Sequence, residues 1–339
     1  MDARVTATLL QLEPGTRIKD KWEVVYKLGQ GGCGAVYEVR TIDGNEKAAL
    51  KVEPKNEEQK GVLKMEVAVL KCLEGKPHVP RMLACGKTAT YCYIVMELLG
   101  PNLSQLRFTV PTNRFTTATA IRVGIQCLQA LKDLHQAGFV HRDVKPGNFV
   151  IGATDKKARI VYLLDYGLAR QYKQPDGSMR RPRQHAYFRG TVRYCSPNVH
   201  KRMEQGRHDD LYSWMYMLIE LLGGLPWTYI RNRDQIQVTK ETILNRTLLE
   251  NCPEEFDQVM EHIKALDYRT EPNYNQITKH LKKVMQRKGY REGDPYDWEE
   301  GGAYFEHTRM GTAAADAVEE QYEEDNPEGE RSLSDRHYR

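Results

Sequence analysis

The chain has 339 residues, which is long enough for two domains or for one unit of two lobes. Its hydrophobic share of 40% and its charged share of 28% are ordinary for a globular protein, which excludes collagen-like, low-complexity and wholly disordered chains. No run approaches ~18 consecutive apolar residues and the first residues lack a secretory pattern, so we expect no membrane span and no membrane partner. Seven scattered cysteines without C-x-x-C spacing predict an intracellular protein, in the cytoplasm or alternatively the nucleus.

Charge is distributed unevenly along the chain. Residues 291–339 hold 15 acidic and 5 basic residues, a net charge of −10, and the other 290 residues hold 45 basic and 31 acidic residues, a net charge of +14. A basic body with an acidic tail suggests acidic partners, and nucleic acid is one candidate at this point. The alternative is an ordinary solvated surface with a solubilising tail.

The first hundred residues mainly predict strands. The segments are, in order, a loosely ordered entry over 1–20, two strands within 22–40 that flank a glycine cluster, a strand over 48–52, a helix over 58–73 and a buried strand over 91–99. Gly100-Pro101 follows the last strand and indicates a linker between two parts of the protein.

Helical spacing dominates after residue 101. Apolar residues recur at helical intervals over 121–134, and residues 210–222 are apolar almost all round, as in a helix buried in a core. Residues 241–286 predict further helices. The predicted organisation is an N-terminal extension over 1–21, a β-rich lobe over 22–96, a hinge over 97–100, a helical lobe over 101–290 and an acidic tail over 291–339 that we expect to be disordered.

The glycine cluster forms the first motif. Residues 29–36 read Gly-Gln-Gly-Gly-Cys-Gly-Ala-Val and match G-x-G-x-x-G-x-V, in which glycines let the backbone fold closely over phosphates. A dinucleotide site would need a helix after these glycines, whereas residues 35–39 predict a strand. The order of elements therefore favours a hairpin that covers a nucleotide.

Lys51 lies in the next predicted strand. A lysine in an apolar strand is most often an edge residue or one with a buried stem. After a glycine hairpin, however, such a lysine can reach the α- and β-phosphates, and Glu66 on the following helix can hold it as an ion pair.

The decisive motif is His141-Arg142-Asp143-Val144-Lys145-Pro146-Gly147-Asn148, which gives the full H-R-D-x-x-x-x-N pattern. In this pattern Asp143 accepts the proton of the attacking hydroxyl, Lys145 steadies the γ-phosphoryl group and Asn148 binds a magnesium ion. Asp165-Tyr166-Gly167 follows 17 residues after Asn148, where D-F-G is expected, and Asp165 would hold the metal that bridges the phosphates. Four motifs in this order leave a purely structural interpretation negligible.

Over residues 22 to about 290 the sequence resembles a eukaryotic protein kinase. It is most similar to the casein kinase I superfamily, which has S-x-N in place of A-P-E, as Ser196-Pro197-Asn198 does here. Within that superfamily it looks closest to the tau-tubulin kinases. The stretches that carry this resemblance are 63–71, 168–172, 188–194, 206–211, 225–227 and 297–299.

The resemblance implies an α+β fold of two lobes, with ATP and Mg²⁺ bound in the cleft. The residues implied for ATP binding are Leu28, Gly29, Gly31, Gly34, Val36, Ala49, Lys51, Met96 as gatekeeper, Glu97 and Leu99 in the hinge, and Val150 as the floor. The implied catalytic residues are Lys51, Glu66, Asp143 and Lys145, and the implied metal ligands are Asn148 and Asp165.

Two residues depart from the family pattern. Tyr166 replaces the usual phenylalanine, and we expect its ring to lie between His141 and the helix that carries Glu66. Pro197 occupies the middle of S-x-N. These departures leave a catalytically weak pseudokinase or a scaffold as the alternative, but the complete set of motif residues favours an active serine/threonine protein kinase. The long segment 165–198 disfavours a small-molecule phosphotransferase.

The basic residues of this segment, called the substrate segment below, include Lys173, Arg180, Arg181, Arg183, Arg189 and Arg193. Because guanidinium groups pair well with carboxylate and phosphate, they predict acidic or already phosphorylated protein substrates. The resemblance points to Arg193 as part of a substrate anion site, with Lys240 as a candidate for its second cation. Cytoskeletal proteins are possible substrates by family resemblance. No nucleic-acid-binding module is recognised, so we expect no nucleic acid partner, and we expect a monomer.

Overall fold

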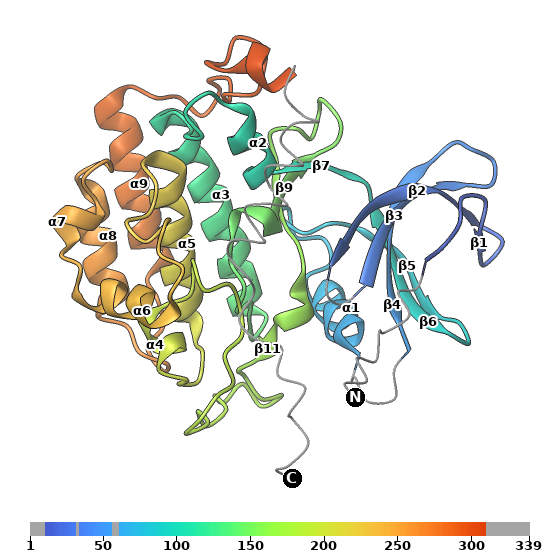
Figure 1. The fold of residues 1–339 in the computed structure, drawn as a ribbon, viewed down its shortest axis with the longest axis horizontal. Coiled ribbons are helices and arrows are strands. Elements are labelled where there is room, and N and C mark those ends of the chain that lie inside the picture. The colour runs from blue at the N-terminus through green and yellow to red at the C-terminus, as the bar shows by residue number, and fades with distance from the viewer. Residues whose placement is uncertain (1–10, 32–33, 56–60, 310–339) are drawn as a thin grey trace.

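The computed structural model describes residues 11–31, 34–55 and 61–309, which form a strand-rich lobe and a helical lobe (Figure 1). The first lobe is an antiparallel sheet of order β1-β2-β3-β4-β6-β5, with helix α1 (Val62–Cys72) packed on it. Its strands are β1 (Arg17–Ile18), β2 (Trp22–Gly31), β3 (Gly34–Thr41), β4 (Lys47–Pro54), β5 (Met82–Lys87) and β6 (Tyr91–Glu97).

The two faces of this sheet have different environments. Side chains alternate across a strand, so Tyr37 and Val39 on β3 share one face with Leu50 on β4 and Val95 on β6. These residues are buried in a hydrophobic cluster of their own. The opposite face carries Lys51, whose ammonium contacts Asp165 in the second lobe.

The second lobe contains the main helices of the chain. They are α2 (Leu103–Thr109), α3 (Thr117–Gln136), α4 (Pro197–His200), α5 (Arg207–Leu222), α6 (Arg233–Thr242), α7 (Asn245–Leu248), α8 (Glu255–Lys264) and α9 (Tyr274–Lys288). The predicted buried helix is confirmed, because α5 is buried along nearly its whole length. A Cβ atom at Gly124 of α3 would lie 2.8 Å from Leu218 Cδ1, so glycine lets α3 and α5 approach closely.

Short strands connect the helices at the boundary of the two lobes. They are β7 (Leu99–Asn102), β8 (Phe139–Val140), β9 (Phe149–Gly152), β10 (Val161–Leu163) and β11 (Arg170–Gln171), with two short 3-10 helices, η1 (Pro146–Asn148) and η2 (Tyr166–Leu168). β7, β9 and β10 form one small sheet, and β8 pairs with β11. Within 11–31, 34–55 and 61–309, no helix is both long and apolar enough to cross a bilayer.

The prediction of a disordered tail beginning at residue 291 is wrong for residues 291–309. Trp298 is buried and packs edge-on against Phe115, with ring centroids 5.6 Å apart. Buried Asp297 accepts hydrogen bonds from the backbone N–H and the hydroxyl of Thr116, both at 2.7 Å. Thr116 is the N-cap of α3, so this segment completes the helical lobe. The remainder of the tail, 310–339, lies outside the described residues.

The predicted start of the folded region at residue 22 is also too late. β1 precedes it and pairs with β2, and Ile18 is buried in the hydrophobic cluster of the sheet. The backbone N–H of Leu12 donates to the hydroxyl of Tyr37 at 3.0 Å. Part of the predicted extension is therefore packed on the first lobe.

Candidate active site

Four residues expected at the nucleotide share the inward face of the first sheet. Val36 pairs with Lys51 across β3 and β4, and Ala49 pairs with Met96 across β4 and β6. Because directly paired residues and alternate residues of a strand lie on the same side, all four belong to one face. Val150 comes from β9 in the second lobe and is buried.

The glycine-rich run connects β2 and β3 as the sequence predicts. Gly29 pairs with Val36, and Gly31 pairs with Gly34, while residues 32–33 lie outside the described residues. A Cβ atom at Gly34 would lie 1.9 Å from the carbonyl oxygen of Val52, so only glycine allows this approach of β3 to β4. Leu28 is 44% exposed just before the run.

Glu97 and Leu99 form the connection between the lobes. Glu97 ends β6, and its backbone N–H donates to the carbonyl of Arg81 at 3.0 Å. Leu99 begins β7 and pairs with Gly152 of β9. The predicted hinge therefore has its first residue in the sheet of one lobe and its third in the small sheet at the boundary.

Lys51 joins the two lobes through two carboxylates. Its ammonium lies 2.8 Å from Glu66 Oε2 on α1 and 3.0 Å from Asp165 Oδ1. Burial disfavours the charged lysine, but both carboxylates raise the pKa of Lys51 above its ordinary value. The same ammonium holds the pKa of Asp165 far below its usual range, whereas burial raises the pKa of Glu66. The Asp165 carboxylate is therefore ionised where phosphates would lie.

The loop after β8 places Asp143 close to three polar groups. Its Oδ1 accepts a hydrogen bond from the Thr191 hydroxyl at 2.8 Å, and its backbone N–H donates to Nδ1 of His141 at 3.2 Å. The Asn148 side-chain amide donates to the backbone carbonyl of Asp143 at 2.8 Å. Sequence reasoning did not identify Thr191, because nothing in its local pattern distinguishes it from an ordinary loop residue.

Asp210 of α5 fixes the backbone of this loop by hydrogen bonds. Its two oxygens accept hydrogen bonds from the backbone N–H groups of His141 at 2.7 Å and Arg142 at 2.8 Å. Nε2 of buried His135 lies 2.8 Å from the same carboxylate. His135 and the backbone groups thus satisfy a buried charge, and the catalytic loop is fixed to α5, which is buried along nearly its whole length.

The donor set at Asn148 and Asp165 fits a magnesium ion. Asn148 offers a neutral amide oxygen and Asp165 an ionised carboxylate oxygen. Hard divalent cations such as Mg²⁺ prefer oxygen ligands of these kinds. The Asn148 NH₂ group donates to the carbonyl of Asp143, which turns the amide oxygen away from that carbonyl. Oδ1 of Asp165 accepts hydrogen bonds from Lys51 and from the backbone N–H of Gly167. Lys145 also lowers the pKa of Asp165, so its positive charge lies near the same carboxylate.

The two departures from the motif pattern have local explanations. The Tyr166 ring is buried against His141, with centroids 5.6 Å apart, and η2 packs on α1, as expected. Its hydroxyl donates to the carbonyl of Leu163 at 3.0 Å, so the extra polar group is satisfied. Pro197 occupies the first turn of α4, whose N-cap is Ser196, and proline suits that position.

Comparison with known proteins agrees with this geometry. The family described as protein kinase domain matches residues 22–282, more than half of the chain. The chain belongs to the protein kinase family. The kinase fold accounts for both lobes and for the order of the motifs along the chain.

Three relatives show how this kinase compares with named proteins. It is 43% identical to a protein of Dictyostelium discoideum named a probable serine/threonine-protein kinase, over 84% of this chain and 58% of the relative. It is 35% identical to a Caenorhabditis elegans protein provisionally named casein kinase I, over 86% and 87% of the two chains. It is 37% identical to an inactive tau-tubulin kinase of C. elegans, over 69% and 86%. The kinase thus spans a little over half the length of the Dictyostelium relative.

The kinase structure contradicts the predicted anion site at Arg193. The Arg193 side chain is 2% exposed, and its Nη1 lies 2.8 Å from Oε1 of Glu220 and 3.3 Å from the Thr228 hydroxyl. An arginine paired in the interior does not offer its charge at the surface. The sequence could not show this pairing, because Glu220 lies 27 positions later on α5.

Other arginines of the same segment surround one acid. Glu204 pairs with Arg183 at 2.5 Å and with Arg170 at 3.3 Å. Burial and the nearby charges of Arg170 and Arg183 lower the pKa of Arg142 to about 9. Glu204 therefore joins Arg170 of β11 to Arg183 of the following loop, a role that its sequence context did not reveal.

Lys240 is buried and donates hydrogen bonds to the backbone of the substrate segment. It is 5% exposed, and its ammonium donates to the carbonyls of Val192 at 2.6 Å and Cys195 at 2.7 Å. It also lies over the rings of Trp227 and Tyr216, 5.2 and 5.4 Å from their centroids. The structure therefore does not support Lys240 as the second cation of an exposed anion site.

The buried Lys240 ammonium predicts a pH effect on stability. Burial, together with Arg193 and Arg233, lowers the pKa of Lys240 to about 8, against the opposing effect of Cys195. Between pH 8 and the ordinary lysine pKa of about 10.4, the unfolded chain binds a proton that the folded chain has released. The free energy of unfolding is therefore expected to rise with pH in this window, by about 1 kcal/mol per unit, relative to Lys240→Met.

Urea unfolding at several pH values measures this difference. Lys279→Met, at an exposed position of α9, is the control and should track the parent at every pH. A constant difference between parent and Lys240→Met over this range would contradict the prediction. His200, 3.4 Å from the ammonium, has a pKa lowered by burial to about 3 and does not titrate in this window.

Proposed function

We propose that this kinase is catalytically active and transfers the γ-phosphoryl group of ATP to serine and threonine hydroxyls of proteins. The observation that carries the proposal is the position of Lys51, which contacts Glu66 and Asp165 at the same time. The lysine–glutamate pair and the metal-binding aspartate must both be in place for phosphoryl transfer in this family.

The catalytic loop supports the chemical step. As the substrate hydroxyl oxygen bonds to the γ-phosphorus, the bond from that phosphorus to the β–γ bridging oxygen breaks, and Asp143 accepts the hydroxyl proton. Thr191 holds Oδ1 of Asp143 and so orients the carboxylate. Lys145 would stabilise the transferred group. Asn148 and Asp165 would hold Mg²⁺, which neutralises phosphate charge when bound.

Within the kinases, we place the chain with the casein kinase I superfamily and, more closely, with the tau-tubulin kinases. Two relatives with those names and the Ser196-Pro197-Asn198 motif support this placement. A preference for acidic or already phosphorylated protein sites is supported by the basic substrate segment, in which Arg180 and Arg181 are exposed.

The alternative of a pseudokinase or scaffold rests on Tyr166 and Pro197 and on one relative that is named inactive. Purified protein, ATP, Mg²⁺ and a serine-containing peptide library test the proposal. We expect transfer of labelled phosphate by the parent and its loss by more than ~10²-fold in Lys51→Met, which removes the phosphate-binding ammonium. The exposed Lys279→Met variant serves as control. Equal labelling by parent and Lys51→Met would reject this assignment.

A further inference from the structure

Helix α1 carries Glu66, but its first turn has no side-chain cap of its own. The N-cap residue is Gly61, which has no side chain, and the first turn contains no acidic residue. The first four N–H groups of a helix lack partners within the helix. Leu63 is buried, so an unsatisfied N–H group there would destabilise the helix end. The donors of this turn therefore need an acceptor from elsewhere in the chain.

Glu53 of β4 supplies that acceptor. Its Oε1 accepts a hydrogen bond from the backbone N–H of Val62 at 3.1 Å, and its Oε2 accepts one from the N–H of Leu63 at 2.8 Å. Glu53 is buried, and the helix dipole stabilises a negative charge at the N-terminus of a helix. Two bonds to consecutive donors fix both the distance and the orientation of the helix end relative to β4.

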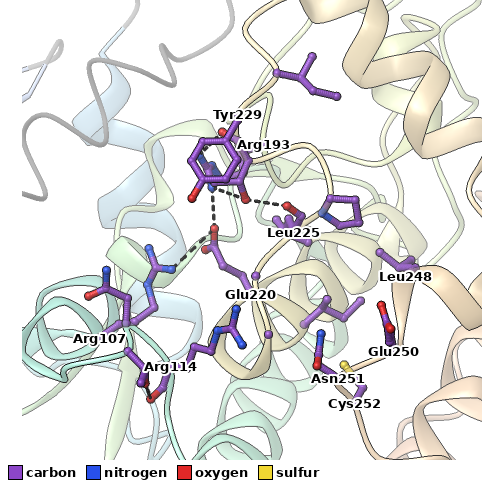
Figure 2. Close-up of a pocket in the computed structure, with 18 of the residues that line it drawn as sticks. Arg107, Arg114, Arg193, Glu220, Leu225, Tyr229, Leu248, Glu250, Asn251 and Cys252 are labelled. Atoms are coloured by element: carbon purple, nitrogen blue, oxygen red, sulfur yellow. Dashed lines mark hydrogen bonds and ion pairs between the residues drawn. The ribbon is translucent and has the colours of Figure 1, made fainter.

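The surroundings of Glu53 differ from those of a buried acid in the helical lobe. Oε1 of Glu220 meets cations, since it lies 2.8 Å from Arg193 and 3.9 Å from Arg107 (Figure 2). Among the residues that the structure describes, the oxygens of Glu53 meet backbone donors and no cation. Removal of the Glu53 carboxylate would therefore leave the end of α1, rather than a charged side chain, without its partner.

The cap and the catalytic ion pair join the same two elements. Lys51 and Glu53 are alternate residues of β4, so they share a face and lie about 6.6 Å apart along the strand. Glu66 follows Leu63 by three residues, which places both on one side of α1, about 4.5 Å apart along its axis. β4 and α1 are therefore held together at two points. One contact alone would let the helix rotate about it, whereas two contacts prevent that rotation.

The capped turn also contacts the metal-binding segment. Helix α1 lies between the sheet and the second lobe and packs on η2 (Figure 1). A Cβ atom at Gly167 would overlap with Cγ1 of Val62, so the side chain of the first helical residue lies directly on this glycine. The backbone N–H of Gly167 donates to Oδ1 of Asp165 at 3.4 Å. Displacement of the helix end would therefore affect both carboxylates that contact Lys51.

We propose that Glu53 is a positioning residue for phosphoryl transfer, which caps α1 from β4 and thereby holds Glu66 against Lys51. The proposal rests on the proposed kinase function and deepens it. Glu53 acts through α1, because both of its oxygens accept hydrogen bonds from the helix end. The lysine–glutamate pair must be in place for phosphoryl transfer in this family, so the position of α1 affects the rate of transfer rather than the affinity for the protein substrate.

Glu53→Gln tests this role, because it keeps the size of the side chain, removes its charge and replaces one acceptor oxygen with an NH₂ group. We expect kcat to fall about tenfold and KM for a serine peptide to stay within about twofold of the parent, as for a lost charged hydrogen bond that affects the chemical step. In a Glu66→Gln background the same change should lower kcat by less than about twofold, since the pair that Glu53 positions is already absent. Glu74→Gln, at an exposed position after α1, is the matched control and should track the parent.

A second variant separates positioning from helix stability. Gly61 has a φ of −28°, so it can carry a side chain, and Gly61→Asp supplies α1 with an N-cap carboxylate of its own. Added to Glu53→Gln, it should restore the free energy of unfolding, measured in urea, but not kcat, because the connection to β4 is still absent. The double variant also permits the assay if Glu53→Gln alone is unfolded. Recovery of kcat together with stability would overturn the proposal.

Equal losses of kcat from Glu53→Gln in the parent and in the Glu66→Gln background would also overturn it. A crystal structure of Glu53→Gln separates this failure from that of the kinase proposal. If the parent transfers no phosphate but Glu66 lies farther from Lys51 in the variant than the 2.8 Å of the parent, the kinase proposal fails and the positioning of Glu66 by Glu53 stands. If the parent is active and the pair is unchanged in the variant, the positioning role fails.

Discussion

Replacing Asp143 with Asn is expected to lower kcat by ~10²–10⁴ with little change in ATP affinity. The amide keeps the size of the side chain and can still accept the Thr191 hydrogen bond, but it cannot take the hydroxyl proton. Single-turnover phosphorylation of a serine peptide measures the chemical step, and a nucleotide-binding assay measures the affinity.

Asp155→Asn is the matched control, since Asp155 is exposed and the chemical change is the same. It should behave like the parent in both assays. A rate for Asp143→Asn equal to that of the parent would show that another group takes the proton, and it would remove Asp143 from the mechanism.

Replacing Tyr166 with Ala is expected to lower the free energy of unfolding by about 3–5 kcal/mol. The ring is buried against His141, and its removal leaves a cavity between η2 and α1 in addition to the lost transfer energy. Tyr166→Phe keeps the ring and loses only the hydrogen bond to Leu163, so it should cost about 1 kcal/mol and retain activity.

Denaturant unfolding measures both variants. Tyr229→Ala serves as control because this side chain is 95% exposed, and it should stay within about 0.5 kcal/mol of the parent. A Tyr166→Phe variant that folds normally but loses catalysis would show that the hydroxyl has a role beyond its hydrogen bond. A Tyr166→Ala variant as stable as the parent would contradict the packing argument.

The nucleotide cleft could be predicted largely from sequence, because its chemistry requires particular residue types at fixed spacing. Lys51 and Glu66 were placed together by motif order alone, and the structure brings them to 2.8 Å. The buried α5 followed from its uniform apolar composition. In both cases the information is local or belongs to a recurrent pattern.

The substrate side could not be predicted in the same way. A count of positive charges does not show which side chains are paired, and both Arg193 and Lys240 turned out to be buried. Their partners lie tens of residues away, with Glu220 on α5 for Arg193 and the carbonyls of Val192 and Cys195 for Lys240. Charge density indicates an environment, whereas tertiary packing decides which charges remain available.

The acidic composition of residues 291–339 also hid the packing of part of this segment on the helical lobe. Asp297 was counted as one more solvated acid, but it caps α3 from 181 positions away in sequence. Tyr296 and Trp298, stacked with centroids 4.9 Å apart, anchor it. Two aromatic residues on either side of an acid were the available signal, and the net charge obscured it.

The position of this segment defines where proteases can attack the kinase. Proteolysis favours exposed chain whose backbone is not held by hydrogen bonds. The carbonyls of Asp294 and Pro295 accept hydrogen bonds from Arg122, which lies on α3, and Arg159 donates to the same stretch. A nick before Asp297 would leave the severed piece held on the N-terminus of α3 by the two hydrogen bonds between Asp297 and Thr116. Trimming of the chain and loss of the folded lobe would then be separate events.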